Sequence, residues 1–277
     1  MEFLSTLYIF ILGTIIGSFL NVVIYRYNSG TSPLKGRSQC FACGKTLYWY
    51  ELIPLASFIV QRARCRGCSV RLSWQYPIVE VLSGLIFVAV FALNKPLFES
   101  IYLVIIFSTL LVIAVYDIRH QIIPDGLVAM FAILSVFWFL WTVPGGLLHA
   151  FQFPYYFTLL AGPLLFLPLW ALWFFSRGRW MGLGDGKLAL GIGWFLGLSL
   201  GMSAIMFGFW IGALFAVVMM VAQRIQQKFT TSKITTTSWT FKSEIPFGPF
   251  LILGVFIVYF THINFFDGSV NIIDLLL

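Results

Sequence analysis

Charged side chains are scarce in this chain. Asp, Glu, Lys and Arg make up 10% of its 277 residues, whereas an ordinary soluble domain carries about 25%. Hydrophobic residues make up 60% of the chain, and the mean hydropathy is +0.94. This composition excludes an ordinary soluble globular protein and indicates a polytopic membrane protein.

Several common catalytic motifs are also missing. The sequence contains no H-E-x-x-H pair and no Walker A loop, and its one G-x-S-x-G string, Gly197–Gly201, lies where two apolar runs meet and not in the strand–turn–helix context of a nucleophile elbow. Its three histidines, His120, His149 and His262, are scattered along the chain. Serine hydrolase and metallohydrolase chemistry therefore have no support, and no glycine-rich fingerprint of a soluble nucleotide-binding fold is present.

Long apolar runs provide the fold class. The start, MEFLSTLYIF, has no basic residue, so we expect a retained first membrane span rather than a secretory signal peptide. A spanning helix needs about 20 apolar residues, and the runs predict an all-α polytopic membrane protein with about eight transmembrane helices. The expected spans are 3–25, 77–93, 98–116, 126–142, 155–175, 186–198, 202–222 and 248–265, of which the sixth is short.

The positions of the cations predict the topology. If the N-terminus lies outside, sixteen of the seventeen Lys and Arg residues fall in inside segments, and only Lys95 falls outside. The positive-inside rule favours this N-out arrangement. The net charge of +7 is then mainly a topology signal, so we expect no nucleic-acid partner. We predict three parts: a first transmembrane helix (1–25), a cytoplasmic zinc-binding loop (26–76) and a seven-helix membrane catalytic domain (77–277).

All four cysteines lie in the predicted cytoplasmic loop, as two C-x-x-C pairs: Cys40 with Cys43, and Cys65 with Cys68. Two such pairs at this spacing can complete a tetrahedral four-thiolate zinc site. The alternatives are unliganded thiols and two disulfides, and a cytoplasmic location argues against disulfides. A closed site leaves no position for substrate, so the zinc is expected to be structural. Glycines at 44 and 67 are expected to ease the two turns.

The same loop carries a basic run, Arg62, Arg64, Arg66 and Arg71. We expect these side chains to face water or anionic lipid headgroups, with substrate binding as the less favoured alternative.

Four acidic residues fall near the predicted cytoplasmic ends of spans: Asp117, Asp125, Asp185 and Glu244. An ionisable group at the hydrocarbon edge is costly and is by default a functional hypothesis. For Asp125, after a proline at a helix start, capping and the helix dipole are an adequate structural explanation. Asp117 also has structural explanations: it could pair with Arg119 or be hydrated at the interface. Asp185 could likewise pair with Lys187 or cap its helix.

The combination of Asp117 and Asp185 suggests a specific chemistry. If the ends of the third and sixth spans pack together, the two carboxyl groups face each other and share one proton. One group can then activate water while the other protonates the carbonyl oxygen or the leaving amine, as in aspartic proteases. The glycines of MGLGDGK, including Gly182 and Gly184, would let a substrate backbone approach closely.

The chain resembles the type IV prepilin peptidases, which belong to the wider group of GxGD aspartyl proteases. The resemblance rests on motifs in the family's order over nearly the whole chain: GSFLNVVIYR, the paired C-x-x-C loop, YPIVE, YDIRHQIIPD, MGLGDGK and IPFGPFL.

This resemblance implies an enzyme of the bacterial inner membrane that cleaves the basic leader of prepilins and pseudopilins after a glycine, at the cytoplasmic face. It implies that Asp117 and Asp185 are catalytic, that Asp125 matches a recurrent position outside this pair, and that the four cysteines bind zinc. We expect supporting roles for Asp125, Gly182, Gly184, Lys187 and Glu244. It also implies N-methylation of the new N-terminus with S-adenosylmethionine. The alternatives are a peptidase without methyl transfer and an ion transporter regulated by a zinc ribbon.

Overall fold

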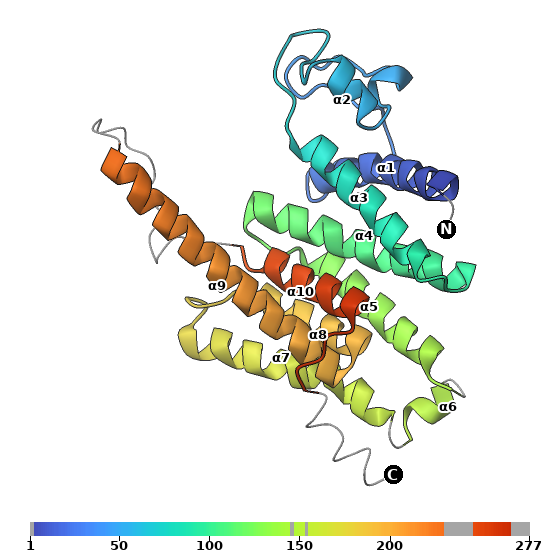
Figure 1. Cartoon of the computed structure of the whole chain (residues 1–277), viewed down its shortest axis with the longest axis vertical. Coiled ribbons are helices and arrows are strands. Elements are labelled where there is room, and N and C mark those ends of the chain that lie inside the picture. Colours follow the sequence, from blue (N-terminus) through green and yellow to red (C-terminus); the bar gives the residue numbers. More distant parts are fainter. Residues whose placement is uncertain (1–2, 145–146, 153–154, 230–245, 267–277) are drawn as a thin grey trace. The chain divides into compact units, whose positions relative to one another are not determined.

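The protein is all-helical (Figure 1). The computed structural model describes residues 3–144, 147–152, 155–229 and 246–266, and within these ranges there is no β-strand, only two isolated bridges. The predicted all-α class is therefore confirmed. The chain divides into two compact units, Met1–Val115 and Tyr116–Leu277, and each is described by itself.

The first unit pairs two apolar helices and carries the cysteine loop between them. α1 packs against α3 along its length. The loop that joins them contains two short helical turns, η1 and α2, which lie next to each other. The unit also contains most of α4. The bounds are α1 Phe3–Arg26, η1 Trp49–Glu51, α2 Ala56–Val60, α3 Gln75–Ala92 and α4 Leu97–His120.

Glycines at a four-residue spacing let α1 and α3 approach closely. A Cβ atom on Gly13 would lie 2.7 Å from the Cα of Gly84, and one on Gly17 would lie 2.8 Å from the Cα of Glu80. Small residues at this spacing are typical of helix pairs in membranes, where close backbone contact replaces the hydrophobic effect.

Buried polar side chains join these two helices to each other and to the loop. The Asn21 side-chain amide donates to the carbonyl oxygen of Tyr76 at 3.2 Å. Glu80, which is buried, accepts a hydrogen bond from the backbone N–H of Leu55 at 2.8 Å. A buried carboxylate is stable only when hydrogen-bonded, so Glu80 fixes the start of α2 against the membrane helices.

The second unit surrounds one short helix with longer ones. α8 packs against α5, α7, α9 and α10, and is the central helix of the unit. The end of α4, from Tyr116 onward, belongs to this unit as well. The bounds are α5 Asp125–Thr142, α6 Leu147–Ala150, α7 Tyr156–Ser176, α8 Leu183–Leu196, α9 Leu198–Phe229 and α10 Gly248–Thr261.

Small residues make the central position of α8 possible. A Cβ on Gly191 would lie 2.6 Å from the Phe131 ring of α5, and one on Gly193 would lie 2.5 Å from the Ala161 carbonyl oxygen of α7. The glycine-rich composition of this segment thus reflects close packing on two sides as well as the turn at its start.

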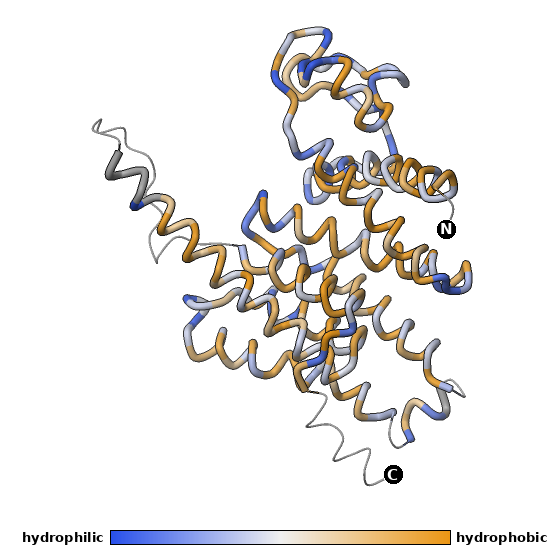
Figure 2. The backbone as a smooth tube through the Cα atoms, viewed as in Figure 1, coloured by the Kyte–Doolittle hydropathy of each residue, from blue (hydrophilic) through white to orange (hydrophobic). Residues whose placement is uncertain are grey.

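Six helices of the described chain are long and apolar enough to cross a membrane: α1, α3, α4, α5, α7 and residues 198–222 of α9. Figure 2 shows hydrophobic residues along the helices and hydrophilic residues concentrated around the α2 loop. α8 and α10 have 14 residues each, which span about 21 Å of a hydrocarbon layer of about 30 Å. Helices therefore occur at all eight expected places, but the number of eight membrane crossings stays a prediction.

Candidate functional site

Two buried carboxylates lie at helix ends in the second unit. Asp117 belongs to the last turn of α4 and is 3% exposed, and Asp185 belongs to the first turn of α8 and is 6% exposed. Their burial excludes a simply hydrated carboxylate at either position. Buried acids of this kind require a specific partner or a function.

The turn before α8 fixes Asp185. Gly182 is the N-cap, in an extended conformation, and Asp185 is the third residue of the helix. The Gly182 backbone N–H interacts with the Asp185 carboxylate, which is half of a capping box. A Cβ on Gly182 would lie 3.5 Å from Asp185 Oδ2. Asp185 thus caps its helix, as the structural alternative predicted.

Asp117 meets the first residue of α10. The Gly248 backbone N–H interacts with its carboxylate, and a Cβ on Gly248 would lie 2.7 Å from Asp117 Oδ2. Real Cβ atoms do not come this close to an oxygen, so any side chain at 248 would displace the carboxylate.

Ile123, in the connection between α4 and α5, lies next to both Gly184 and Gly248. A Cβ on Gly184 would be 2.8 Å from the Ile123 Cβ, and one on Gly248 would be 3.0 Å from the Ile123 Cδ1. The Asp117 charge acts on Asp185, so the ends of α4 and α8 bring the two acids into electrostatic range. In this conformation, Gly184 makes room for Ile123.

Each carboxyl group keeps one oxygen unused. Asp117 Oδ2 and Asp185 Oδ1 are buried and have no hydrogen-bond partner in the part of the chain that the structure describes. Two buried carboxyl groups that influence each other electrostatically do not both ionise easily. This arrangement can hold a water molecule, activate it and protonate a second oxygen or nitrogen.

The supporting residues lie beside this pair. Lys187 Nζ forms an ion pair with Asp125 Oδ1 at 2.7 Å, joining α8 to the start of α5. Lys187 therefore pairs with Asp125, and the alternative of a pair with Asp185 is not observed. The Asp125 side chain is 73% exposed, so this residue is not a third buried acid. It lies in the first turn of α5 without a capping hydrogen bond, and the helix dipole accounts for it. Glu244 lies outside the described residues.

The four cysteines form a candidate metal centre within the first unit. Their Sγ atoms all lie within 4.8 Å of one another, and Cys40 Sγ is 3.9 Å from Cys68 Sγ. Tetrahedral coordination at a Zn–S distance of about 2.3 Å needs sulfur separations of about 3.8 Å. All four thiols are free, so the disulfide alternative is not observed and the donor set fits a metal.

Two similar turns position these thiols. In each turn the backbone N–H of the first cysteine donates to the carbonyl oxygen of the residue five positions later. The carbonyl oxygen of the same cysteine, Cys40 or Cys65, accepts a hydrogen bond from the backbone N–H of the residue four positions later. Gly44 and Ser69, the residues after the second cysteine of each turn, have positive φ angles of 69° and 57°. Gly44 thus has the backbone conformation that favours glycine, whereas Gly67 does not have a positive φ, and a Cβ there would lie 3.2 Å from Lys45 Cδ and 3.5 Å from Cys43 Sγ. Gly67 donates its N–H to Cys65 Sγ at 3.3 Å.

Local electrostatics favour one thiolate at Cys65. The backbone N–H groups of Cys68 and Gly67 lower the pKa of Cys65 to about 6, whereas burial and the neighbouring thiols of Cys43 and Cys65 raise the pKa of Cys68 to about 11. A cation is required to hold four thiolates at these distances, because like charges this close repel one another. Beside the cluster, the Tyr48 backbone N–H, with the Lys45 ammonium at 3.1 Å, lowers the pKa of Glu51.

Sequence reasoning missed two residues of the carboxylate site, Ile123 and Gly248. Both belong to motifs that were visible in the sequence, QIIPD and IPFGPFL. An isoleucine in a loop and a glycine at a helix start carry no chemical signal of their own. Only the distances to Asp117 and Gly184 reveal them.

Comparison with known proteins adds the following findings. Residues 11–93 match the model described as "Bacterial Peptidase A24 N-terminal domain". Residues 104–217 match the model described as "Type IV leader peptidase family". The first match contains the four cysteines, and the second contains both buried aspartates.

Curated relatives extend the match. The Bacillus subtilis protein named "Prepilin leader peptidase/N-methyltransferase" is 29% identical over 254 residues, 91% of this chain and 92% of that relative. A relative of the same name from Klebsiella pneumoniae is 31% identical over 208 residues, 70% of this chain and 86% of that protein. One from Myxococcus xanthus is 44% identical over 121 residues, 44% of this chain and 36% of the relative. No solved structure matches.

Proposed function

Since the chain belongs to the type IV leader peptidase family, we propose that it is an aspartyl endopeptidase of the membrane, with Asp117 and Asp185 as its catalytic pair. Its substrates are prepilins and pseudopilins, and the bond that it cleaves follows a glycine at the end of their basic leader. The observation that carries this proposal is the pair of buried carboxyl groups, each with one oxygen unpaired among the described residues.

The pair supports hydrolysis through a shared proton. The ionised carboxylate takes a proton from water as the water oxygen attacks the scissile carbonyl carbon. The protonated carboxyl group donates its proton to the carbonyl oxygen, which gives a neutral tetrahedral diol. The first group then delivers its new proton to the leaving nitrogen as the C–N bond breaks, while the second recovers its proton from the diol. The pair is thus returned to its starting state.

Ile123 and the two glycines give this site its shape. Ile123 fills the space next to the Cα atoms of Gly184 and Gly248, so neither position can carry a larger side chain without displacing it. A narrow site favours an extended substrate with little bulk at the scissile bond. This agrees with cleavage after a glycine.

The metal of the cysteine loop is zinc in this proposal, held by Cys40, Cys43, Cys65 and Cys68. When bound, zinc supplies structural cross-linking of the loop, because four protein thiolates close its coordination shell. The loop residues themselves hold the centre to the membrane helices through Glu80 and Leu55.

Methyl transfer is the second proposed activity. The relatives from Bacillus subtilis and Klebsiella pneumoniae are named as N-methyltransferases as well as peptidases. S-adenosylmethionine is the methyl donor in this proposal, and the acceptor is the amine that cleavage releases.

The proposed location is the bacterial inner membrane, with the N-terminus outside and the aspartates facing the cytoplasm. The distribution of Lys and Arg supports this orientation. An ion transporter is the alternative interpretation of two buried acids in a membrane protein. Transport sites usually lie near the bilayer midplane, whereas Asp117 and Asp185 lie in the terminal turns of their helices.

Cleavage of a purified prepilin by the full chain in liposomes tests the proposal. We expect release of the leader without added cofactor, and a further 14 Da on the new N-terminus only when S-adenosylmethionine is added, about the mass of one CH₂ group. Mass spectrometry reads both products. Leader release without the mass increase would remove the methyltransferase half, and no leader release would contradict the peptidase assignment.

A further inference from the structure

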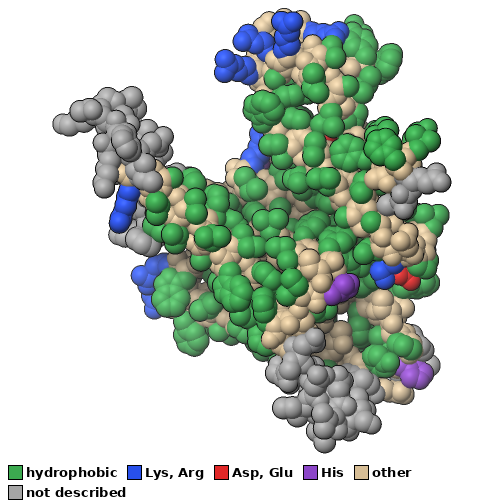
Figure 3. All heavy atoms as spheres, viewed as in Figure 1, with side chains coloured by type: hydrophobic (Ala, Val, Ile, Leu, Met, Phe, Trp, Pro, Cys, Tyr) green, Lys and Arg blue, Asp and Glu red, His purple; other side chains and the backbone are tan. Residues whose placement is uncertain are grey.

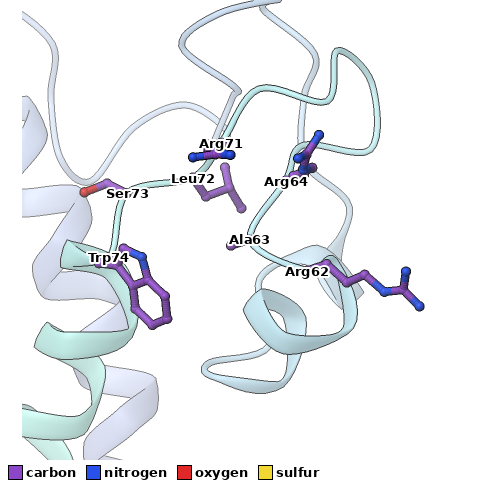
Figure 4. Close-up of a pocket in the computed structure, with 7 residues that line it drawn as sticks. All are labelled: Arg62, Ala63, Arg64, Arg71, Leu72, Ser73 and Trp74. Carbon is purple, nitrogen blue, oxygen red and sulfur yellow. The ribbon is translucent and has the colours of Figure 1, made fainter.

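A basic hollow lies beside the second cysteine turn. It has a volume of about 670 Å³, and its lining includes Arg62, Arg64, Arg71 and Trp74. Figure 4 shows Arg64 and Arg71 above it and Trp74 below, while the Arg62 side chain extends away. None of the catalytic or metal-binding residues lines this hollow.

Two of these arginines are held together without a counter-charge. Arg64 and Arg71 form an isolated antiparallel bridge, which places their Cβ atoms about 5 Å apart on the same side. Like charges placed directly opposite are destabilising. No ion pair among the described residues includes Arg62, Arg64 or Arg71.

The acidic residues that the structure describes in the first unit are engaged elsewhere. Glu51 accepts from Lys45 and from the Tyr48 N–H. Glu80 accepts from the Leu55 N–H, and Glu99 pairs with Lys95. The bridged arginines therefore present positive charge that only a bound anion or solvent can balance.

An apolar hollow adjoins the basic one. It has a volume of about 370 Å³, and Arg62, Ala63 and Trp74 line both hollows. Its other walls are the apolar residues Leu55, Phe58, Ile59 and Pro77. Pro77 lies in the first turn of α3, the candidate membrane span Gln75–Ala92. The apolar hollow thus lies beside the start of this candidate span.

We propose that the two hollows together bind one anionic phospholipid. The guanidinium groups of Arg64 and Arg71 contact the phosphate, because arginine offers a planar, permanently charged fork that matches phosphate oxygens. An acyl chain occupies the apolar hollow against Ile59 and Trp74. A tryptophan at the membrane–water interface is typical of such positions.

Charge complementarity supports this occupant. Lys and Arg side chains gather over the loop that contains α2 (Figure 3), and basic clusters next to a membrane helix are attracted to anionic lipids. A free phosphate ion would use the arginines but leave the adjoining apolar hollow without a ligand. The phospholipid satisfies both, and it fixes the metal-binding loop to the membrane surface.

Native mass spectrometry of the full chain in detergent tests the site. The protein is titrated with phosphatidylglycerol or with phosphatidylcholine, and the same spectra report bound metal, which shows whether the loop is folded. The double variant Arg64→Gln/Arg71→Gln is compared with Lys35→Gln/Arg37→Gln, which removes the same charge from the same loop away from the hollow. Each arginine is expected to contribute about fivefold to anionic lipid binding, so about 25-fold for the pair.

The expected result is a preference for phosphatidylglycerol that only the first double variant loses. Equal losses in both double variants, or no loss in either, would overturn the proposal. So would competition by millimolar inorganic phosphate, which would indicate a free-anion site. A neighbouring pair tests the apolar half: Ile59 lines the hollow and is 73% exposed, and Val60 does not line it and is 68% exposed. Ile59→Ser should weaken lipid binding and Val60→Ser should not.

If the arginine variant loses its metal, the Ile59 and Val60 variants decide alone. Equal lipid affinity in these two single variants would then overturn the proposal. None of these measurements depends on cleavage of a prepilin, so the outcome is independent of the proposed peptidase activity.

Discussion

Gly184→Ala is the substitution that most sharply tests the role of the close contact beside the aspartates. The added Cβ would lie 2.8 Å from the Ile123 Cβ, whereas carbon atoms pack at about 3.5–4.0 Å. A Cβ atom cannot rotate away on its own backbone, so the connection between α4 and α5 must shift by roughly 1 Å, the difference between these distances. Overpacking of this kind costs about 1–3 kcal/mol.

The shift moves the catalytic geometry. Ile123 contacts the Gly248 position that adjoins Asp117, so displacement of Ile123 also disturbs the spacing of the two carboxyl groups. Misplacement by about 1 Å can cost about 100-fold in rate. We therefore expect kcat/KM for prepilin cleavage to fall by about 100-fold in Gly184→Ala, measured on a purified substrate in detergent.

Gly186→Ala is the matched control, two residues along the same helix. A Cβ there would lie 3.5 Å from the Phe166 ring, an ordinary contact, and alanine is about 1 kcal/mol better than glycine within a helix. This variant should keep its activity within about threefold, since it introduces no close contact. Full activity in Gly184→Ala, or an equal loss in both variants, would refute the reasoning.

Three further predictions concern the residues around the two centres. Asp125→Asn should lower cleavage less than tenfold in the same assay, because its exposed ion pair with Lys187 is worth about 0–1 kcal/mol; a loss as large as that of a catalytic aspartate would contradict this. Cys40→Ser should remove bound zinc, as measured by elemental analysis, and should lower the thermal unfolding temperature. A zinc-free protein with unchanged stability would show that the metal has no structural role. Glu51→Gln should reduce hydrogen-exchange protection of the loop at pH 7. The native state favours the charged form of Glu51 and lowers its pKa, so this stabilisation is present above about pH 4.5 and is lost as the pH falls through the lowered value. The variant and the unmodified protein should therefore converge at acid pH, and a difference that persists there would contradict the assignment.

Much of the fold could be predicted because its determinants are local in the sequence. Apolar runs define helices, and the structure has a helix at each of the eight expected places. The spacing of the two C-x-x-C pairs predicted the sulfur cluster, since a tight turn brings each pair together without help from the rest of the fold. Asp117 and Asp185 were identified because acids are rare in an apolar chain.

The remaining features depend on tertiary packing. The position of α8 at the centre of its unit arises from contacts of Gly191 and Gly193 with α5 and α7, which no single segment encodes. The pairing of Lys187 with Asp125 instead of Asp185 depends on how α8 meets the start of α5. Gly44 has the backbone conformation that favours glycine, but its counterpart is Ser69 because the two turns are equivalent by position and not by residue type.

The most direct test of the central claim is the cleavage rate of purified Asp117→Asn and Asp185→Asn proteins in liposomes, with Asp125→Asn as the control. Asparagine keeps the shape of the side chain but cannot accept the proton of the attacking water or share one with its partner. The catalytic pair predicts that each of the first two variants binds zinc, inserts into the membrane and releases no detectable leader, while Asp125→Asn cleaves. Retained cleavage by either Asp117→Asn or Asp185→Asn would contradict the account.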